Sequence, residues 1–148
     1  DLYELSKEVI RRLENQAHKK NVTFHLIGGK AEIMGVHKIL DEMLYNLCDN
    51  AIKYNKENGT VDVLVNQTRE DVSVIVRDTG IGIPPAHQNR VFERFYRVDK
   101  SHSKKVGGTG LGLAIVKHGA ICHHAKISLE STVDVGTAIT IAFASAPK

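Results

Sequence analysis

Two asparagines and a lysine share one face of an expected helix. Asn46, Asn50 and Lys53 follow one another at spacings of four and three residues, which puts them on the same side of a helix. Asparagine is disfavoured inside helices because its side chain competes for backbone hydrogen bonds. The pattern predicts a polar wall, with amide oxygens for a hard cation and a lysine for anionic oxygens. The alternative is an ordinary solvated helix face.

A loop with two glycines directly follows an expected strand. Asp78 ends the strand, and Gly80, Gly82 and Pro84 follow in the loop. The glycines allow the backbone to approach a flat ligand or to adopt positive φ, and the Asp78 carboxylate can accept a hydrogen bond from an exocyclic amine. The alternative is a plain turn capped by Asp78, followed by a helix with Pro84 at its first position.

A second glycine-rich segment, 107–113, opens an expected helix. Backbone N–H groups at a helix N-terminus form an anion site, and phosphate is the obvious guest. The spacing matches neither the P-loop nor the dinucleotide fingerprint.

Between the two glycine segments, residues 90–106 carry six basic and two acidic residues together with an aromatic cluster of Phe92, Phe95 and Tyr96. This segment predicts a cationic cover over a ligand, and the alternative is a solvated charged loop.

The elements that must position these groups are visible in the apolar periodicity. Apolar residues three and four apart indicate helices at 2–20, 36–54 and 111–123. Alternating apolar residues indicate strands at 22–26, 61–65, 72–76, 126–130 and 138–143, and a further short strand is expected at 31–34. Such an order predicts two layers, with the helices on one face of a largely antiparallel sheet.

Composition limits the function classes. The chain has 148 residues, 42% hydrophobic and 25% charged, which suits one ordinary domain. A net charge of +3 and 5% aromatic residues without tryptophan argue against nucleic-acid binding. There is no apolar run long enough for a membrane span. Cys48 and Cys122 fall within helical patterns, so we expect a reducing cytosolic setting.

The motifs together, in this order, resemble the ATP-binding catalytic domain of sensor histidine kinases, within the wider family of the gyrase, heat-shock chaperone and mismatch-repair ATPases. Among these kinases the chain looks closest to the bacterial phosphate-sensing type. The resemblance implies a two-layer α/β sandwich of the Bergerat type, with about three helices on one face of a mixed, mostly antiparallel sheet. Segments 46–54, 78–82, 92–97, 108–113 and 136–137 look like the N box, first glycine box, F box, second glycine box and last glycine motif.

The resemblance also implies roles for single residues. Asn50 would ligate Mg²⁺ with Asn46 beside it, Lys53 would reach phosphate oxygens, and Tyr54 would pack near the base or ribose. Asp78 would accept the adenine amine, helped through water by Thr137. The remaining nucleotide contacts would come from Gly80, Gly82 and Ile83 near the purine, from Arg97 and Lys105 at the γ-phosphate, and from the segment Gly108, Thr109, Gly110, Leu111 and Gly112.

The resemblance favours a kinase over an ATPase. The family's ATPases carry a glutamate four residues before the metal-binding asparagine, and here that position is Asn46, whose amide cannot take a proton. We therefore expect ATP and Mg²⁺ binding and phosphoryl transfer to a histidine on a separate dimerisation and phosphoacceptor domain, then to a response regulator receiver domain. None of the eight histidines precedes an acidic residue, so the chain is expected not to label itself. The alternatives are a nucleotide-gated interaction module and an ATPase of the same superfamily.

The match covers residues 1–148 as one catalytic domain, with a lid at about 90–109. The resemblance leads us to expect the phosphoacceptor and sensor domains outside this sequence. We expect a monomeric fragment from the cytosolic part of a membrane-anchored kinase. Two positions depart from the family pattern: Val36, where an aspartate is common before the N-box helix, and Val135, before Gly136 and Thr137.

Overall fold

The computed structural model describes residues 1–93 and 112–144. The helices are α1 (Leu2–Lys19), α2 (His37–Lys53) and α4 (Gly112–Cys122), with a short 3-10 helix, η1 (Pro85–His87). The strands are β1 (Thr23–Gly28), β2 (Thr60–Gln67), β3 (Asp71–Asp78), β4 (Lys126–Thr132) and β5 (Gly136–Ala144). The three predicted helices and the five main predicted strands are confirmed, with the helix boundaries within about one residue of expectation. In the part of the chain with described structure, no helix combines the length and apolarity that a membrane span requires.

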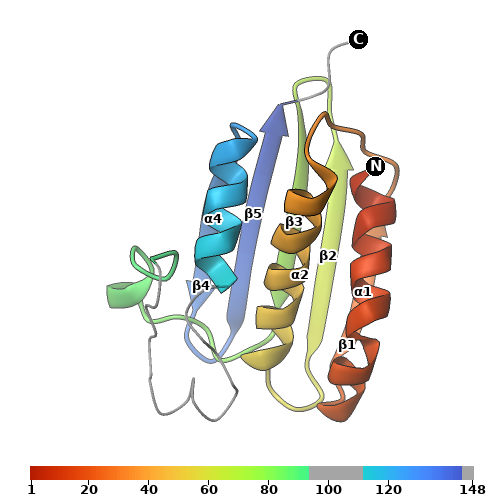
Figure 1. Ribbon diagram of the computed structural model, residues 1–148. Coiled ribbons are helices and arrows are strands. Elements are labelled where there is room, and N and C mark those ends of the chain that lie inside the picture. The colour runs from red at the N-terminus through yellow and green to blue at the C-terminus, as the bar shows by residue number, and fades with distance from the viewer. Residues whose placement is uncertain (94–111, 145–148) are drawn as a thin grey trace.

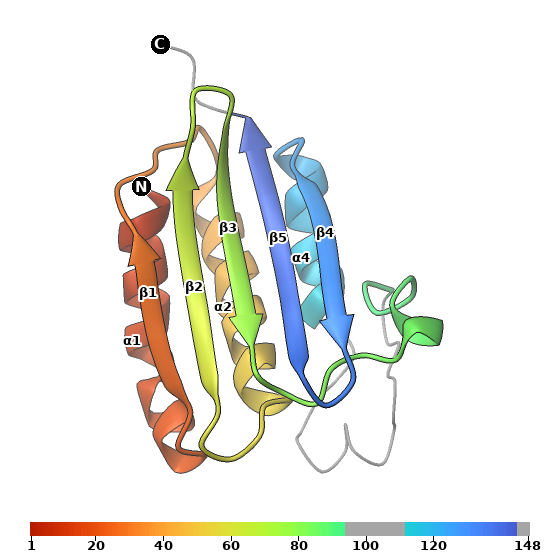
Figure 2. The ribbon, with the colours of Figure 1, turned by 180° about the vertical axis from the view of Figure 1, so that it is seen from behind.

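The molecule has two layers. The strands form one sheet in the order β1-β2-β3-β5-β4, and α1, α2 and α4 lie side by side over one face of it (Figure 1). The view from behind shows the strands in front of all three helices (Figure 2). β1 runs parallel to β2, whereas the other neighbouring pairs are antiparallel. The prediction of a mixed, mostly antiparallel sheet beneath three helices is therefore confirmed.

The core lies between the layers, where the apolar sides of the helices face the apolar side of the sheet. In α1 the predicted stripe, from Leu2 through Val9 to Ala17, is buried. In β2 and β3 every second residue is buried, and the register pairs Val63 with Val76 and Val65 with Val74. Removing this apolar surface from water provides the main driving force for the layering.

Two local predictions were wrong. Residues 31–34 form no strand, because the backbone of Ala31 is already used at the start of α1: its carbonyl accepts from the Leu2 amide (2.8 Å) and its amide donates to Asp1 Oδ1 (3.2 Å). The helix after the first glycine loop does not have Pro84 at its first position. Pro84 is the N-cap, with an extended ψ of 142°, and the 3-10 helix begins at Pro85.

The C-terminal end of α2 is fixed by groups from both sides. The Lys20 ammonium donates to the carbonyl oxygens of Lys53 (2.8 Å) and Ile52 (3.3 Å) at the helix end, where the Ile52 oxygen also accepts from the Asn55 amide (3.1 Å). Burial lowers the pKa of Lys20. Asn55 is buried just beyond the helix, donates to the Thr60 carbonyl (3.0 Å) and accepts from Thr79 Oγ1 (3.2 Å). The helix end is thereby fixed to the sheet.

Gly136 is required where β5 begins beside the end of β3. Its φ is +145°, a conformation that residues with a Cβ rarely adopt, and a Cβ there would collide with the carbonyl oxygen of Asp78. We expect Gly136→Ala to lower the free energy of unfolding by about 2–4 kcal/mol, measured by urea denaturation. Gly29→Ala is the matched control, since a Cβ at Gly29 meets no atom within 4 Å, and should change stability by less than about 1 kcal/mol. Equal effects of the two substitutions on the free energy of unfolding would contradict the requirement for glycine at position 136.

Candidate active site

Four segments that are distant in the sequence meet at one end of the sheet. β3 ends at Asp78, and the β3–β5 register places Thr137 opposite it. The C-terminal half of α2 and the first residue of α4 lie at the same end, the lower one in Figure 1. The first glycine box, the N box, the start of α4 and the last glycine motif are therefore close together, as the motif order predicts.

Asp78 holds a largely buried carboxylate at this end. Its Oδ1 accepts hydrogen bonds from the backbone amides of Gly80 (2.8 Å) and Thr137 (3.3 Å). Burial raises the pKa of Asp78 from its ordinary 3.8 to about 6, and the two amide hydrogen bonds oppose that rise. Within the described residues no donor bonds to Oδ2, so that this oxygen can accept a hydrogen bond from a ligand.

The loop after Asp78 packs against the end of α2. The Ile81 amide donates to the carbonyl oxygen of Tyr54, the C-cap residue of α2 (3.0 Å). Gly80 lies so close that a Cβ there would collide with the same oxygen. The glycine at position 80 is therefore explained by this close approach, and it aligns the loop with the helix that carries both asparagines.

The other side of the loop is tied to the β4–β5 turn. The Ile83 amide donates to Ser131 Oγ (2.7 Å), and Ser131 Oγ lies 2.7 Å from Thr137 Oγ1. The Asp134 amide donates to the Ile81 carbonyl (2.9 Å). Gly82, at φ +74°, makes the turn between these contacts. Ser131 was not predicted as a site residue, because nothing in the local sequence shows that β4 would pass beside this loop.

Asn46 and Asn50 face the start of α4. A Cβ at Gly112 would lie 3.3 Å from Asn46 Oδ1 and 3.3 Å from Asn50 Nδ2, so a side chain there would have to push the amides back by a few tenths of an ångström. Asn46 Nδ2 donates to the Glu42 carbonyl one turn earlier (2.7 Å). That bond fixes the amide orientation and leaves Oδ1 on the side of Gly112. The predicted shared face of the two asparagines is confirmed by this geometry.

Lys53 is paired with a residue that the sequence analysis missed. Its ammonium lies 2.9 Å from Asp49 Oδ2, an i,i+4 pair in which both side chains are mostly buried. The spacing of four residues between an acid and a following lysine could have revealed the pair. The lysine is therefore held on the face of α2 that carries Asn46 and Asn50, beside a counter-charge that any anionic ligand must replace or share.

The lid prediction falls mainly outside the described residues. Within the described part of that segment, Val91 is buried and Phe92 packs against the core, so the first aromatic of the F box acts as the expected anchor. Among residues 1–93 and 112–144, no cluster of three or more His, Cys, Asp or Glu could hold a metal ion. The predicted ligands outside the described residues are Arg97, Lys105, Gly108, Thr109, Gly110 and Leu111.

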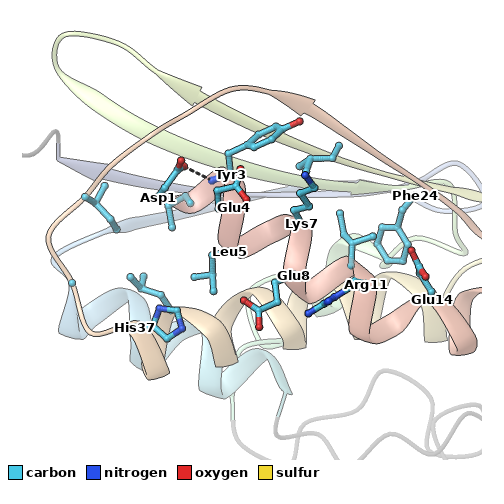
Figure 3. Close-up of a pocket in the computed structure, with 16 residues that line it drawn as sticks. Asp1, Tyr3, Glu4, Leu5, Lys7, Glu8, Arg11, Glu14, Phe24 and His37 are labelled. Atoms are coloured by element: carbon cyan, nitrogen blue, oxygen red, sulfur yellow. Dashed lines mark hydrogen bonds between the residues drawn. The ribbon is translucent and has the colours of Figure 1, made fainter.

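A large open pocket lies elsewhere, around the N-terminal half of α1. Its volume is about 900 Å³, and it contains none of the predicted site residues. Figure 3 shows Lys7, Glu8, Arg11 and Glu14 projecting from α1 along it, with His37 at one end. Its walls mix both signs of charge, and it lies beside the N-terminal part of α2, away from Asn46 and Asn50.

Comparison with known proteins agrees with this geometry. A family model described as histidine kinase-, DNA gyrase B-, and HSP90-like ATPase matches residues 35–147. The chain belongs to this family. The predicted kinship with the catalytic domain of sensor histidine kinases is thus confirmed, and membership of the family implies ATP binding.

The relatives of this histidine kinase catalytic domain are longer proteins. The sensor histidine kinase RppB of Synechocystis sp. is 40% identical over 116 residues, which cover 78% of this chain and 26% of that protein. The phosphate regulon sensor protein PhoR of Pseudomonas aeruginosa is 41% identical over 115 residues, again 78% of this chain and 26% of that protein. The solved structure of the mycobacterial sensor histidine kinase MprB superposes with a TM-score of 0.85 at 28% identity, covering 100% of this chain and 97% of that one.

The raised pKa of Asp78 predicts a pH dependence of nucleotide binding. Because Oδ1 accepts from the Gly80 and Thr137 amides, a proton on the carboxyl group would reside on Oδ2, the oxygen left for the amine, so the affinity for ATP should fall as pH decreases through about 6. We expect about a tenfold loss per pH unit below that value, measured by calorimetric titration between pH 7.5 and 5. The same titration of Asp78→Asn is the control, because its pH dependence reports only the protonation of the nucleotide itself. If the affinities of wild type and variant fall in parallel with decreasing pH, the assignment of Asp78 is contradicted.

Asp78→Asn should also separate binding from stability. An amide oxygen can still accept from the Gly80 and Thr137 amides, and the buried charge disappears. Because the folded pKa lies above the unfolded one, the wild-type free energy of unfolding falls as pH rises between 3.8 and about 6. At pH 7.5 the variant should therefore unfold at the same or a higher denaturant concentration than wild type while binding ATP poorly. Loss of both properties would indicate a structural role only.

Proposed function

We propose that this domain binds Mg-ATP at the end of the sheet where Asp78, Asn46 and Asn50 meet, and donates the γ-phosphoryl group to a histidine on a separate phosphoacceptor domain. The observation that carries the proposal is the convergence, at one end of the sheet, of the partly buried Asp78 carboxylate with the Asn46 and Asn50 amides, which lie beside Gly112 at the start of α4. These groups come from β3, α2 and α4, which only this fold brings together.

The residues fit an adenine at the end of β3. Asp78 offers an unfilled carboxylate oxygen to the exocyclic amine, and Thr137 lies opposite with its hydroxyl 2.7 Å from Ser131 Oγ. Gly80 and Gly82 let the loop beside the proposed base pack against the carbonyl oxygens of Tyr54 and Thr132, with which a Cβ at these positions would collide. A carboxylate accepts the amine of adenine but repels the carbonyl of a 6-oxopurine, so the site would select adenine nucleotides.

The face of α2 fits a triphosphate with a bound cation. Amide oxygens suit Mg²⁺, and Asn50 would hold the ion, which neutralises phosphate charge when bound. Asn46 Oδ1 lies on the same side. Lys53 would bind phosphate oxygens from its position beside Asp49. Arg97, Lys105 and the segment 108–111 complete the site in this proposal.

Transfer is favoured over hydrolysis by the chemistry of this face. Asn46 stands where a general base would be needed, and its amide is already bonded to Glu42. Asp49 is an acid on the same face, and its Oδ2 is engaged by the Lys53 ammonium. A histidine nitrogen needs little activation: its lone pair attacks the γ-phosphorus, the bond to the bridging oxygen breaks, and ADP leaves with those electrons.

The partners follow from this assignment. The phosphoryl acceptor would be the dimerisation and phosphoacceptor domain of the same kinase, and the phosphohistidine would then pass its group to an aspartate of a response regulator receiver domain. In this proposal the domain belongs to the cytosolic part of a membrane-anchored sensor kinase.

The test is transfer in trans. With γ-labelled ATP the chain alone should remain unlabelled and release little phosphate, whereas adding the separately expressed phosphoacceptor domain should give an acid-labile, base-stable phosphohistidine on that partner. Asn50→Ala should abolish labelling, since the cation site is lost. Tight ATP binding without transfer would favour the nucleotide-gated interaction module, and rapid phosphate release by the chain alone would favour the ATPase.

A further inference from the structure

Helix α2 begins without a side-chain cap of its own. Its N-cap residue is Val36, which has the extended conformation of an N-cap (φ −93°, ψ 112°) but no side-chain acceptor. Ser, Thr, Asp and Asn are the usual residues at such a position, because their oxygens bond to the exposed amides of the first turn. The helix that carries Asn46 and Asn50 therefore starts at a weak point.

The histidine that directly follows α4, His123, accepts a hydrogen bond from the backbone at this position. The Val36 amide donates to His123 Nε2 (2.9 Å), and His123 Nδ1 lies 2.8 Å from the Gly119 carbonyl one turn earlier. The first bond requires Nε2 to be an acceptor, and the second requires Nδ1 to be a donor. Only the neutral Nδ1–H tautomer satisfies both, so the ring forms a directed bridge from α4 to the start of α2.

The residues around the His123 ring leave space for it and contact it. A Cβ at Gly35 would lie 2.7 Å from His123 Cδ2 and Nε2, so this position admits the ring only because it is glycine. The ring edge also meets Phe143 of β5, with centroids 6.2 Å apart and an interplanar angle of 85°. The bridge is thus packed between two elements as well as hydrogen-bonded.

The bridge lies at the opposite end of α4 from the nucleotide site. α4 runs antiparallel to α2 and touches it at three levels: Gly112 beside Asn46 and Asn50, Gly119 against Met43, and His123 at Val36. An α-helix of this length is a rigid rod of about 16 Å. If the His123 end is released, α4 can pivot on the Gly119 contact and move Gly112 away from the two amides.

We propose that His123 is a positioning residue for nucleotide binding: its bridge from α4 to the uncapped start of α2 sets the distance between Gly112 and the Asn46–Asn50 face. The inference rests on the proposed function, because it assumes that ATP binds at that face. A purely structural role would stabilise the fold without altering the affinity for ATP once stability is restored.

Two substitutions separate the bridge from the rest of the side chain. His123→Gln places an amide oxygen near the position of Nε2 and can still accept from Val36, whereas His123→Asn reaches only the carbonyl of Gly119. We expect His123→Asn to weaken ATP binding about five- to tenfold and His123→Gln to stay within about twofold of wild type, measured by calorimetry with Mg-ATP. His118→Ala, on the exposed side of the same helix, is the matched control and should bind like wild type.

A compensating substitution distinguishes position from stability. Val36→Asp would give α2 a conventional N-cap and should restore the melting temperature of His123→Asn. It cannot replace the link to α4, so the affinity for ATP should remain reduced in the double variant. Recovery of both properties, or equal affinities for His123→Gln and His123→Asn, would overturn the proposal.

A measurement on the unmodified chain covers the case in which a variant does not fold. Long-range ¹⁵N correlation spectra should show His123 as the Nδ1–H tautomer with an unprotonated Nε2, and the Val36 amide should exchange slowly with solvent. An Nε2–H tautomer or a rapidly exchanging Val36 amide would overturn the bridge. Absence of ATP binding by wild type would instead contradict the proposed function, so the two failures are distinguishable.

Discussion

The site depends on one costly arrangement, a charged carboxylate held largely out of water at the end of β3. Burial alone would favour its neutral form. Two backbone amides oppose that effect, and each comes from a different element: Gly80 from the loop and Thr137 from β5. The β3–β5 register, the positive φ of Gly136 and the ties from the loop to Ser131 and Tyr54 are all needed to keep these donors in place.

The second half of the site is organised by a single helix. α2 supplies both asparagines and the lysine, so the position of its axis decides where all three groups lie. Its C-terminal end is fixed by Lys20 and by the buried Asn55, and at its N-terminal end the Val36 amide donates a hydrogen bond to His123, the residue after α4. Glycines at 112 and 119 let α4 pack closely along it. In the proposed site, adenine recognition and phosphate binding are thus joined by packing between helices and sheet.

The local patterns predicted the helices and most strands well, because each buries one regular stripe or face. The strand expected at 31–34 failed since the backbone of Ala31 bonds to the start of α1, a tertiary contact that periodicity does not report. The parallel pairing of β1 with β2 also has no local signature. Asn46, Asn50 and Asp78 were identifiable from type and spacing, whereas Ser131 and His123 gain their contacts only through the fold. Asp49 differs from these two residues, because its spacing of four residues from Lys53 is visible in the sequence and could have predicted the ion pair.

The central claim is that the ionised carboxylate of Asp78 accepts the exocyclic amine of adenine. The most direct test compares ATP with inosine triphosphate, which differs by a carbonyl oxygen in place of that amine, in calorimetric titrations of the wild-type chain at pH 7.5. The account predicts that inosine triphosphate binds at least about a hundredfold more weakly, because its oxygen would face an anion. Affinities that agree within about threefold would contradict it.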